Sequence, residues 1–296
     1  MRRAVAALAG AAATAVVAGV CAAATRCRPG PPAEDGVSGA GEGVSHGPWQ
    51  RTNYRGNTVS LTGGIAAAAG TTVAALATAA PARTAAAAAL ATVGAAGFGL
   101  VDDRSPDPAG ARGLRGHLRA LARGQITTGT LKLVGIPALS LVAAALLERD
   151  RSERCAGPVG RALDVLTSGA LIAGTANLVN LFDLRPGRAL KATGAISLPL
   201  AVLPGPAGPV AAGTCGVLAA AWADDLAERT MLGDTGANAL GALAGTGLAL
   251  LPSAAVRAGA LTGVVALIGL SEKVSFSAVI DRTALARAVD RWGRLP

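Results

Sequence analysis

The chain has 296 residues and a mass of 28.8 kDa; 51% of its residues are hydrophobic, 2% are aromatic and 15% are charged, and its mean hydropathy is +0.47. Soluble domains carry about 25% charged residues, so this composition excludes an ordinary water-soluble domain and favours a membrane protein. The net charge of +9 does not indicate nucleic-acid binding, because the basic residues lie between apolar runs and are not interleaved with aromatic residues.

The N-terminal segment begins with Arg2 and Arg3, and an apolar stretch then continues to Thr25. A basic start followed by apolar residues is typical of a secretory signal peptide. This stretch is longer than the apolar part of such signals, and further apolar runs follow it. We therefore predict a retained first transmembrane helix over 1–25, with a cleaved signal as the alternative, and a cytoplasmic loop over 26–57.

Apolar runs that are long enough, or nearly so, to cross about 30 Å of hydrocarbon recur along the chain. They predict nine transmembrane helices, at 4–25, 58–80, 84–101, 126–147, 162–182, 192–204, 207–223, 237–251 and 254–270. The expected fold is an all-α, polytopic protein with a single integral membrane domain over 1–296. Its helical core, expected to hold the functional site, covers 58–270, and a cytoplasmic tail covers 271–296.

Basic residues are divided unequally between the two predicted membrane sides. Of the 27 Lys and Arg residues, 18 lie in the tail and in the loops after odd-numbered spans, and eight lie on the other side. Because basic loops stay in the cytoplasm, we predict the N-terminus outside and the C-terminus in the cytoplasm. Lys132 lies within a span and belongs to neither group.

Acidic and amide residues gather at the predicted cytoplasmic ends of the spans. They are Asp102, Asp103, Asn177, Asn180, Asp183, Asp224, Asp225 and Asp234. Carboxylates near hydrocarbon are costly and are usually functional, so this gathering predicts a polar site at the membrane surface.

Asp102 and Asp103 end a hydrophobic run, in the segment Gly99–Arg104. Two adjacent carboxylates repel each other, and a divalent cation or a raised pKa relieves the repulsion. Taken alone, the pair is also explained by two solvated aspartates that end a helix.

Asn177, Asn180 and Asp183 are spaced by three residues, so on a helix they share one face. Amides and a carboxylate on a stripe of an apolar span need polar partners, and capping of the helix end would use only the last of them. Arg185 and Lys191 follow, and their charge suits a phosphate-bearing ligand.

Residues 231–238 read Met-Leu-Gly-Asp-Thr-Gly-Ala-Asn, a glycine-flanked loop that opens a span. Glycine permits close approach to the backbone, and N–H groups at a helix start favour anions such as phosphate. Asp234 would hold a cation that bridges those phosphates, since hard oxygen ligands suit Mg²⁺. An ordinary helix start is the alternative.

In order and spacing, these three segments resemble the motifs of the polyprenyl-phosphate N-acetylhexosamine-1-phosphate transferases. That superfamily includes phospho-N-acetylmuramoyl-pentapeptide transferase and the UDP-GlcNAc:undecaprenyl-phosphate GlcNAc-1-phosphate transferases. The resemblance runs from about Asn53 through the last span. It includes Leu61-Thr62-Gly63-Gly64-Ile65, which looks like the glycine-glycine start of the family's second helix.

The resemblance implies that a polyprenyl phosphate attacks the sugar-proximal phosphate of a UDP-sugar, with release of UMP and with Mg²⁺, or Mn²⁺ in its place, as cofactor. Such phosphoryl transfer needs charge neutralisation and alignment above all. The expected catalytic residues are Asp102, Asp103, Asp183 and Lys132, the substrate-binding residues are Asn177, Asn180, Arg185 and Lys191, and the metal ligands are Asp234 and Asp183. The expected location is the plasma membrane, with the active site at the cytoplasmic face and a homodimer left open.

The tail departs from the family pattern. Many members carry a histidine-containing motif in the last cytoplasmic segment, tied to sugar-nucleotide recognition, whereas residues 271–277 here read Ser-Glu-Lys-Val-Ser-Phe-Ser. The only histidines are His46 and His117, and His117 is read as a surface loop residue. The donor sugar and the pathway served are therefore left open. Asp224 and Asp225 are either extra cation ligands or loop charge.

Two other classes of protein were weighed against the enzyme. A non-catalytic membrane transporter or lipid-phosphate-binding homologue would account for the missing histidines, yet every acidic position expected for metal and phosphate chemistry is present. A CDP-alcohol phosphotransferase would carry a repeated Asp-rich helix signature, which the chain lacks. We therefore expect the glycosyl-1-phosphate transferase.

Overall fold

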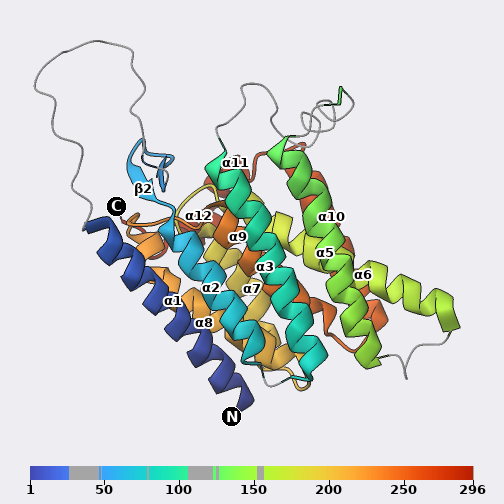
Figure 1. The fold of residues 1–296 in the computed structure, drawn as a ribbon. Coiled ribbons are helices and arrows are strands. Elements are labelled where there is room, and N and C mark those ends of the chain that lie inside the picture. Colours follow the sequence, from blue (N-terminus) through green and yellow to red (C-terminus); the bar gives the residue numbers. More distant parts are fainter. Residues whose placement is uncertain are drawn as a thin grey trace, which may run out of the picture.

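The computed structural model describes residues 1–26, 47, 49–78, 80–105, 123–124, 127–151 and 157–295. Within these ranges it contains eleven helices and one antiparallel hairpin (Figure 1). The helices are α1 (Arg2–Arg26), α2 (Thr62–Leu76), α3 (Ala82–Arg104), α5 (Thr128–Arg151), α6 (Gly157–Phe182), α7 (Arg188–Ala201), α8 (Ala207–Leu226), α9 (Gly233–Ala249), α10 (Ala254–Ser271), α11 (Phe276–Arg282) and α12 (Ala284–Arg291). The strands are β1 (Gln50–Thr52) and β2 (Thr58–Ser60), and we call the end of the bundle beside them the hairpin end.

These helices fit the predicted all-α membrane protein. Among the described residues, five helices are long and apolar enough to cross a membrane, at Arg2–Ala23, Ala82–Arg104, Thr128–Leu147, Gly157–Phe182 and Ala254–Ser271. The other predicted spans fall on α2, α7, α8 and α9, of which α2, α7 and α9 have 17 residues or fewer. The count of nine spans and the orientation therefore stay predictions.

One predicted boundary differs from the structure. The span expected over 58–80 begins only at Thr62, because Thr58–Ser60 pairs with Gln50–Thr52 as a strand. β-branched residues such as Thr58 and Val59 favour an extended backbone. The hairpin also shows that the region assigned to a loop over 26–57 contains regular structure in its described part.

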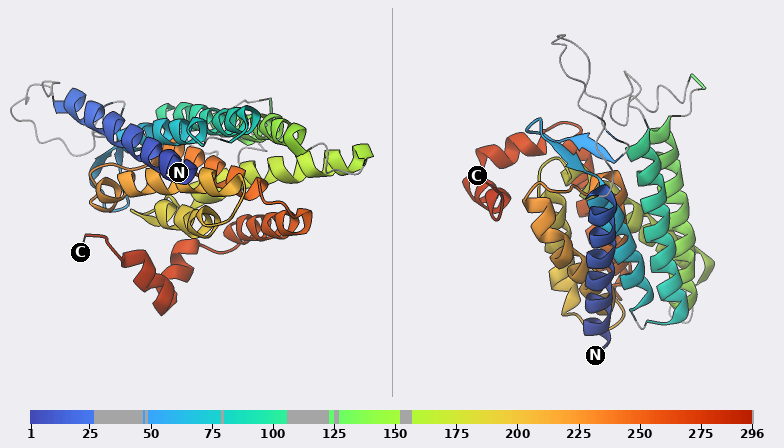
Figure 2. Two further views of the ribbon diagram at one scale, coloured as in Figure 1. Left: turned by 90° about the horizontal axis from the view of Figure 1, so that it is seen from below. Right: turned by 60° about the vertical axis from the view of Figure 1, so that its left-hand side comes forward.

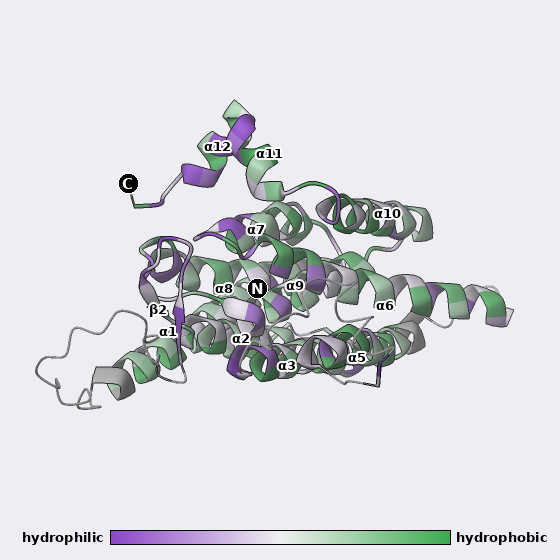
Figure 3. Cartoon of the chain, turned by 90° about the horizontal axis from the view of Figure 1, so that it is seen from above, coloured by the Kyte–Doolittle hydropathy of each residue, from purple (hydrophilic) through white to green (hydrophobic). Residues whose placement is uncertain are grey.

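Helix α9 lies in the middle of the bundle (Figure 3). Almost all of its residues are buried. It packs most extensively against α6 and α3. Gly241 and Gly245 are one turn apart and lie against α6, where an added Cβ would stand 2.6 Å from Cα of Ala176 and 2.8 Å from Cα of Ile172. The abundance of small residues thus has a direct use, because it lets helix backbones approach closely.

The start of α2 is joined to the segment that precedes α9. The N–H of Gly64 donates to the carbonyl of Met231 at 3.1 Å, and the N–H of Met231 donates to the carbonyl of Ser60 at 2.9 Å. A Cβ on Gly64 would overlap the carbonyl oxygen of Leu232. The Gly63-Gly64 pair therefore allows a contact between two backbones, and this contact helps to set where α9 begins.

A buried ion pair joins α6 and α10 at the opposite end of the bundle. Arg257 pairs with Asp164, the two side chains are 5% and 8% exposed, and Arg257 Nη1 also donates to the carbonyl of Leu251 at 2.5 Å. Neither charge is free to reach the functional site. We therefore assign the pair to helix packing.

The last residues leave the bundle and fold back. After α10, the short helices α11 and α12 stand at the side of the bundle near its hairpin end (Figure 2). This is the segment expected as a tail over 271–296, and in the structure it is helical over Phe276–Arg282 and Ala284–Arg291.

We expect the substitution Gly64→Ala to destabilise the protein by about 1–3 kcal/mol, because the new methyl group forces two backbones apart in a packed core. The measurement is the thermal unfolding midpoint in detergent. Gly263→Ala on α10 is the matched control, since no atom lies within 4 Å of a Cβ there. Equal midpoints for the two variants would contradict the contact described for Gly64.

Candidate active site

The polar residues singled out in the sequence come from four helices that meet at the hairpin end. Helix α3 packs against α5 and α9, and α6 packs against α5 and α9. Four helix ends therefore face one another: the last turn of α3, the first turns of α5, the last turns of α6 and the first turn of α9. They carry, in this order, Asp102 and Asp103, Lys132, Asn177 and Asn180, and Asp234.

Lys132 connects its own helix, α5, to the other three. Its ammonium pairs with Asp234 Oδ2 and lies 3.6 Å from Asp102 Oδ2. With its amide oxygen turned toward Lys132, Asn180 accepts from Nζ at 2.9 Å and donates to Asp234 Oδ1 at 2.8 Å. The lysine side chain is only 14% exposed, so its charge acts on these carboxylates with little screening by water.

Asp103 has a different surrounding from Asp102, although the two are adjacent in sequence. Its carboxylate accepts from the N–H of Asp234 at 3.0 Å, from the N–H of Thr235 at 2.8 Å and from Thr235 Oγ1 at 2.6 Å. These N–H groups belong to the first turn of α9, which has no intrahelical acceptor for them. Asp103 therefore caps α9 from α3, whereas Asp102 accepts from Thr128 Oγ1 at 2.7 Å and faces Lys132 and the Asp234 carboxyl.

Asp183 follows α6 and is partly buried beside other acids. Burial raises the pKa of its carboxyl well above the ordinary value, and the charges of Asp225 and Asp234 raise it further. Lys132 lies beside both Asp234 and Asp102, so its single positive charge is already shared between two carboxylates and does not offset the negative charge of Asp183. A divalent cation or a substrate proton would relieve this repulsion.

The donor set fits Mg²⁺ in one particular way. In the part of the chain that the structure describes, no three His, Cys, Asp or Glu side chains form a ready-made metal site. Mg²⁺ is commonly held by one or two carboxylates together with substrate phosphates. Asp234 and Asp183 supply hard oxygen ligands of this kind, so they suit a metal that binds together with phosphate.

A cavity of about 300 Å³ opens on the Lys132 side of this cluster. One part of its lining is polar and the other is apolar. The polar residues are Asp102, Lys132, Asn177, Asn180, Asn238 and Glu272, and the apolar residues include Leu133, Ile136, Pro137, Leu181 and Ile268. A ligand with a charged head and a hydrocarbon chain would match both parts.

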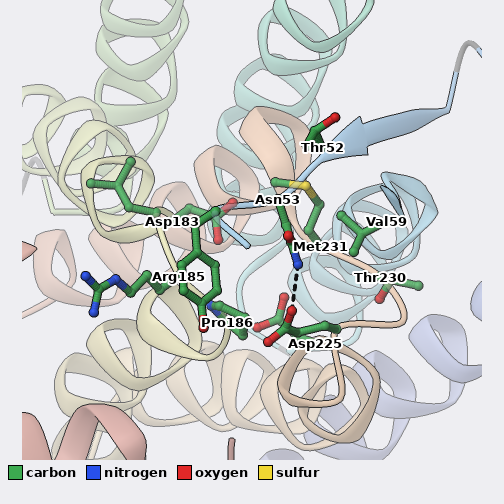
Figure 4. Close-up of a pocket in the computed structure, with 12 residues that line it drawn as sticks. Thr52, Asn53, Val59, Asp183, Arg185, Pro186, Asp225, Thr230 and Met231 are labelled. Carbon is green, nitrogen blue, oxygen red and sulfur yellow. Dashed lines mark hydrogen bonds between the residues drawn. The ribbon is translucent and has the colours of Figure 1, made fainter. Parts of the chain in front are cut away.

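A second cavity of about 300 Å³ lies on the Asp183 side, between the hairpin, the 183–186 segment and the residues before α9 (Figure 4). Asn53 and Tyr54 of the hairpin line it together with Asp183, Arg185 and Met231. Asn53 Nδ2 donates to Glu228 Oε2 at 2.6 Å, which attaches the hairpin to the residues after α8. The hairpin was absent from our sequence expectations, because three-residue strands leave almost no periodic signal.

Arg185 and Lys191 are near the second cavity, but the tail contacts both of them. The guanidinium of Arg185 binds Asp281 with two hydrogen bonds of 3.1 and 3.0 Å. Lys191 Nζ donates to the carbonyls of Asp290 and Trp292 at 2.8 and 2.7 Å. A substrate anion that uses these two cations would have to compete with the tail or bind beside it.

Asp290 is the residue through which the tail is held. Its carboxylate pairs with Arg188 at 2.7 Å and with Arg294 at 2.6 Å, and its side chain is 5% exposed. Burial alone would raise the pKa of the Asp290 carboxyl, but the hydrogen bonds from Arg188 and the charge of Arg294 outweigh it and hold this pKa below the ordinary value. No sequence signal identified Asp290, because its partner Arg188 lies about 100 residues earlier in the chain.

The remaining sequence candidates have structural partners or lie outside the described residues. Asp225 accepts from the N–H of Gly187 at 2.6 Å, and Asp224 pairs with Arg229 at 2.5 Å, so both already have a partner within the protein. His46 and His117 lie outside the described residues.

Asn238 is a site residue that the sequence motif contained without a role assigned to it. It lies four residues after Asp234, hence on the same helix face. Its Nδ2 donates to the carbonyl of Asp234 at 2.7 Å, while its Oδ1 is buried and has no partner. Asn238 also belongs to the lining of the first cavity.

We expect Asp103→Ala to lower stability by about 1–2 kcal/mol, since it removes the cap of α9. The thermal unfolding midpoint in detergent measures this loss. Asp102→Ala is the comparison, because Asp102 holds no helix end, and we expect a smaller shift for it. Equal shifts would contradict the division of roles between the two aspartates.

Asp290→Ala should release the tail, because it leaves the buried Arg188 guanidinium without its carboxylate. We expect trypsin to cleave after Arg282 and Arg287 about tenfold faster, which corresponds to about 1.4 kcal/mol of lost docking free energy. Asp224→Ala is the control, since it removes an exposed ion pair with Arg229 that lies outside the tail. Because the pKa of Asp290 is lowered, docking of the unsubstituted tail should hold at neutral pH and weaken only as the pH falls through that lowered value.

Comparison with known proteins adds no identification. No protein-family model matches this chain, and no curated protein matches it. The case for a function therefore rests on the three sequence motifs and on the geometry of the site.

Proposed function

We propose that this protein transfers a sugar-1-phosphate from a UDP-sugar to a polyprenyl phosphate, with release of UMP, in the biosynthesis of a cell-wall or other glycopolymer. The observation that carries the proposal is the presence of two cavities on either side of one charged cluster. Lys132 and Asn180 line the amphipathic cavity, and Asp183 lines the second cavity. Asn180 and Asp183 are joined at the end of α6, where the N–H of Asp183 donates to the carbonyl of Asn180 at 3.0 Å.

The amphipathic cavity suits the acceptor. A polyprenyl phosphate combines a phosphate with a long hydrocarbon chain, and Lys132 would bind the phosphate as a point charge. Leu133 and Ile136, on the same helix, would contact the first isoprene units. Asp102 is the better placed of the two adjacent aspartates to take a proton from the phosphate, because both oxygens of Asp103 are occupied by α9.

The second cavity suits the nucleotide part of the donor. Asn53 and Tyr54 offer polar and aromatic contacts, and Arg185 is at its edge. Asp234 and Asp183 would hold Mg²⁺, or Mn²⁺, which when bound neutralises phosphate charge and polarises the bond to be broken.

In the proposed reaction, an oxygen of the lipid phosphate forms a bond to the sugar-bearing phosphorus of the UDP-sugar. The bond between that phosphorus and the bridging oxygen breaks, and the oxygen leaves with UMP. Lys132 orients the attacking phosphate, while Asn180 keeps Lys132 and Asp234 in position. Alignment and charge neutralisation of this kind are the main requirements of phosphoryl transfer.

The hairpin end would face the cytoplasm of a nine-span protein in the plasma membrane. The excess of basic residues predicted for that side supports this orientation. The aromatic residues support a membrane–water boundary at this end, without bearing on which side it faces: Trp49 and Tyr54 are beside the hairpin, and Trp222 and Trp292 contact each other near the tail, with ring centroids 5.4 Å apart. Trp and Tyr are enriched where a membrane meets water.

The alternative is a membrane transporter or lipid-phosphate-binding homologue without catalysis. Such a protein would use the same Lys132 and the same amphipathic cavity. It would bind polyprenyl phosphate but release no UMP, and this outcome separates it from the enzyme.

The test is UMP release by the purified protein with Mg²⁺, undecaprenyl phosphate and a panel of UDP-sugars that includes UDP-GlcNAc and UDP-MurNAc-pentapeptide. We expect one donor to give UMP and the lipid-linked product, and EDTA to stop the reaction. Asp234→Asn should lower the rate on the order of 100-fold or more, since it removes a preorganised charge from the transition state.

Asp224→Asn is the matched control. It also replaces an acid at the hairpin end, but Asp224 pairs only with the exposed Arg229 side chain, so we expect a rate close to that of the unsubstituted protein. Absence of UMP with every donor, or an unchanged rate in Asp234→Asn, would contradict the proposed function.

A further inference from the structure

Helix α12 exposes a stripe of large apolar side chains. Leu285, Val289 and Trp292 are 77%, 52% and 65% exposed. Spacings of four and three residues place them on one side of the helix. Apolar side chains this large are normally covered when they lie together.

A neighbouring side of α12, about 100° around the helix from the stripe, is fixed to the bundle. Asp290 is buried in its pairs with Arg188 and Arg294, and Ala286, one turn earlier, is partly buried. Trp292, directly after α12, contacts Trp222 of the bundle with one side of its ring and is still 65% exposed. Leu285 and Val289 point past the bundle, so the bundle does not cover them while the ion pairs persist.

The exposed charges around the stripe are positive. Arg282, Arg287 and Arg291 are exposed. The acids of α11 and α12 do not balance them, because Asp281 binds Arg185 and Asp290 binds Arg188. An amphipathic helix with basic residues and a tryptophan beside its apolar face is typical of peripheral binding to anionic lipid.

The position of α12 agrees with such a role. It stands beside the bundle, near the hairpin end (Figure 2), and Trp292 packs against Trp222 in the last turns of α8. Trp222 would lie where a transmembrane bundle meets the lipid headgroups. The apolar stripe would reach the same depth.

We propose that α12 lies in the lipid–water interface, where Leu285, Val289 and Trp292 insert between lipids and Arg282, Arg287 and Arg291 bind anionic headgroups. A second copy of the chain is a poorer occupant. In a symmetric dimer the same surface meets itself, which would oppose these arginines to one another. The proposal needs the bundle to be in a membrane, but it does not depend on the transferase activity.

The test uses the full chain without its native cysteines, with one cysteine at position 285 or 289 that carries an environment-sensitive fluorophore. The protein is placed in nanodiscs of phosphatidylcholine, alone or with about one-third phosphatidylglycerol. We expect both labels to be quenched by lipids with a spin label near the headgroup, and more strongly with phosphatidylglycerol. A label at position 284, which is exposed and lies outside both the apolar stripe and the three arginines, is the matched control and should stay accessible to iodide.

The charge requirement is tested by replacing Arg282, Arg287 and Arg291 with Gln, which should abolish the gain with phosphatidylglycerol. All three are exposed, so the protein should still fold. Equal iodide quenching at 284, 285 and 289 in both lipids would overturn the proposal. Protection of position 285 that rises with protein concentration in detergent would also overturn it, because a second copy would then cover the stripe.

Discussion

The hydrogen bonds from the start of α9 to Asp103 are the constraint on which the rest of the site depends. The first N–H groups of a helix have no acceptor within the helix, so where they are buried they need one from the rest of the protein. Asp103 supplies it from the last turn of α3 and so fixes the height at which α9 begins. On the side of α2, the contact of Gly64 with Leu232 fixes how closely the start of α9 approaches that helix. Together they place the Asp234 carboxylate beside Lys132.

The balance of charge around that carboxylate follows from this placement. Lys132 is shared between Asp234 and Asp102, while Asp183 and Asp225 add negative charge nearby. In surroundings of low dielectric constant, such an excess of carboxylates is costly unless a cation joins them. The site is therefore arranged to gain from a ligand that brings a divalent cation with its phosphates. The same excess would repel a phosphate that came without one.

The tail connects the surface of the protein to this site. Asp290 holds α12 against Arg188 and Lys191, at the start of α7, and Arg294 donates to the carbonyl of Pro186 at 2.7 Å. Pro186 and Arg185 line the second cavity. The tail thus supports one wall of the cavity from outside. Where many members of the resembled family have a histidine motif, this chain has ion pairs.

The sequence by itself determined the apolar, small-residue helical bundle and the three polar segments at its helix ends. It did so because apolar run length and a spacing of three or four residues are local properties of a chain. Only the tertiary structure decided that Asp103 caps α9 while Asp102 faces Lys132, and that Asp281 and Asp290 engage Arg185, Arg188 and Lys191. Adjacent aspartates look alike in sequence, and partners about 100 residues apart leave no periodic signal. Their roles depend on the distances between helices, which glycine contacts across the bundle set.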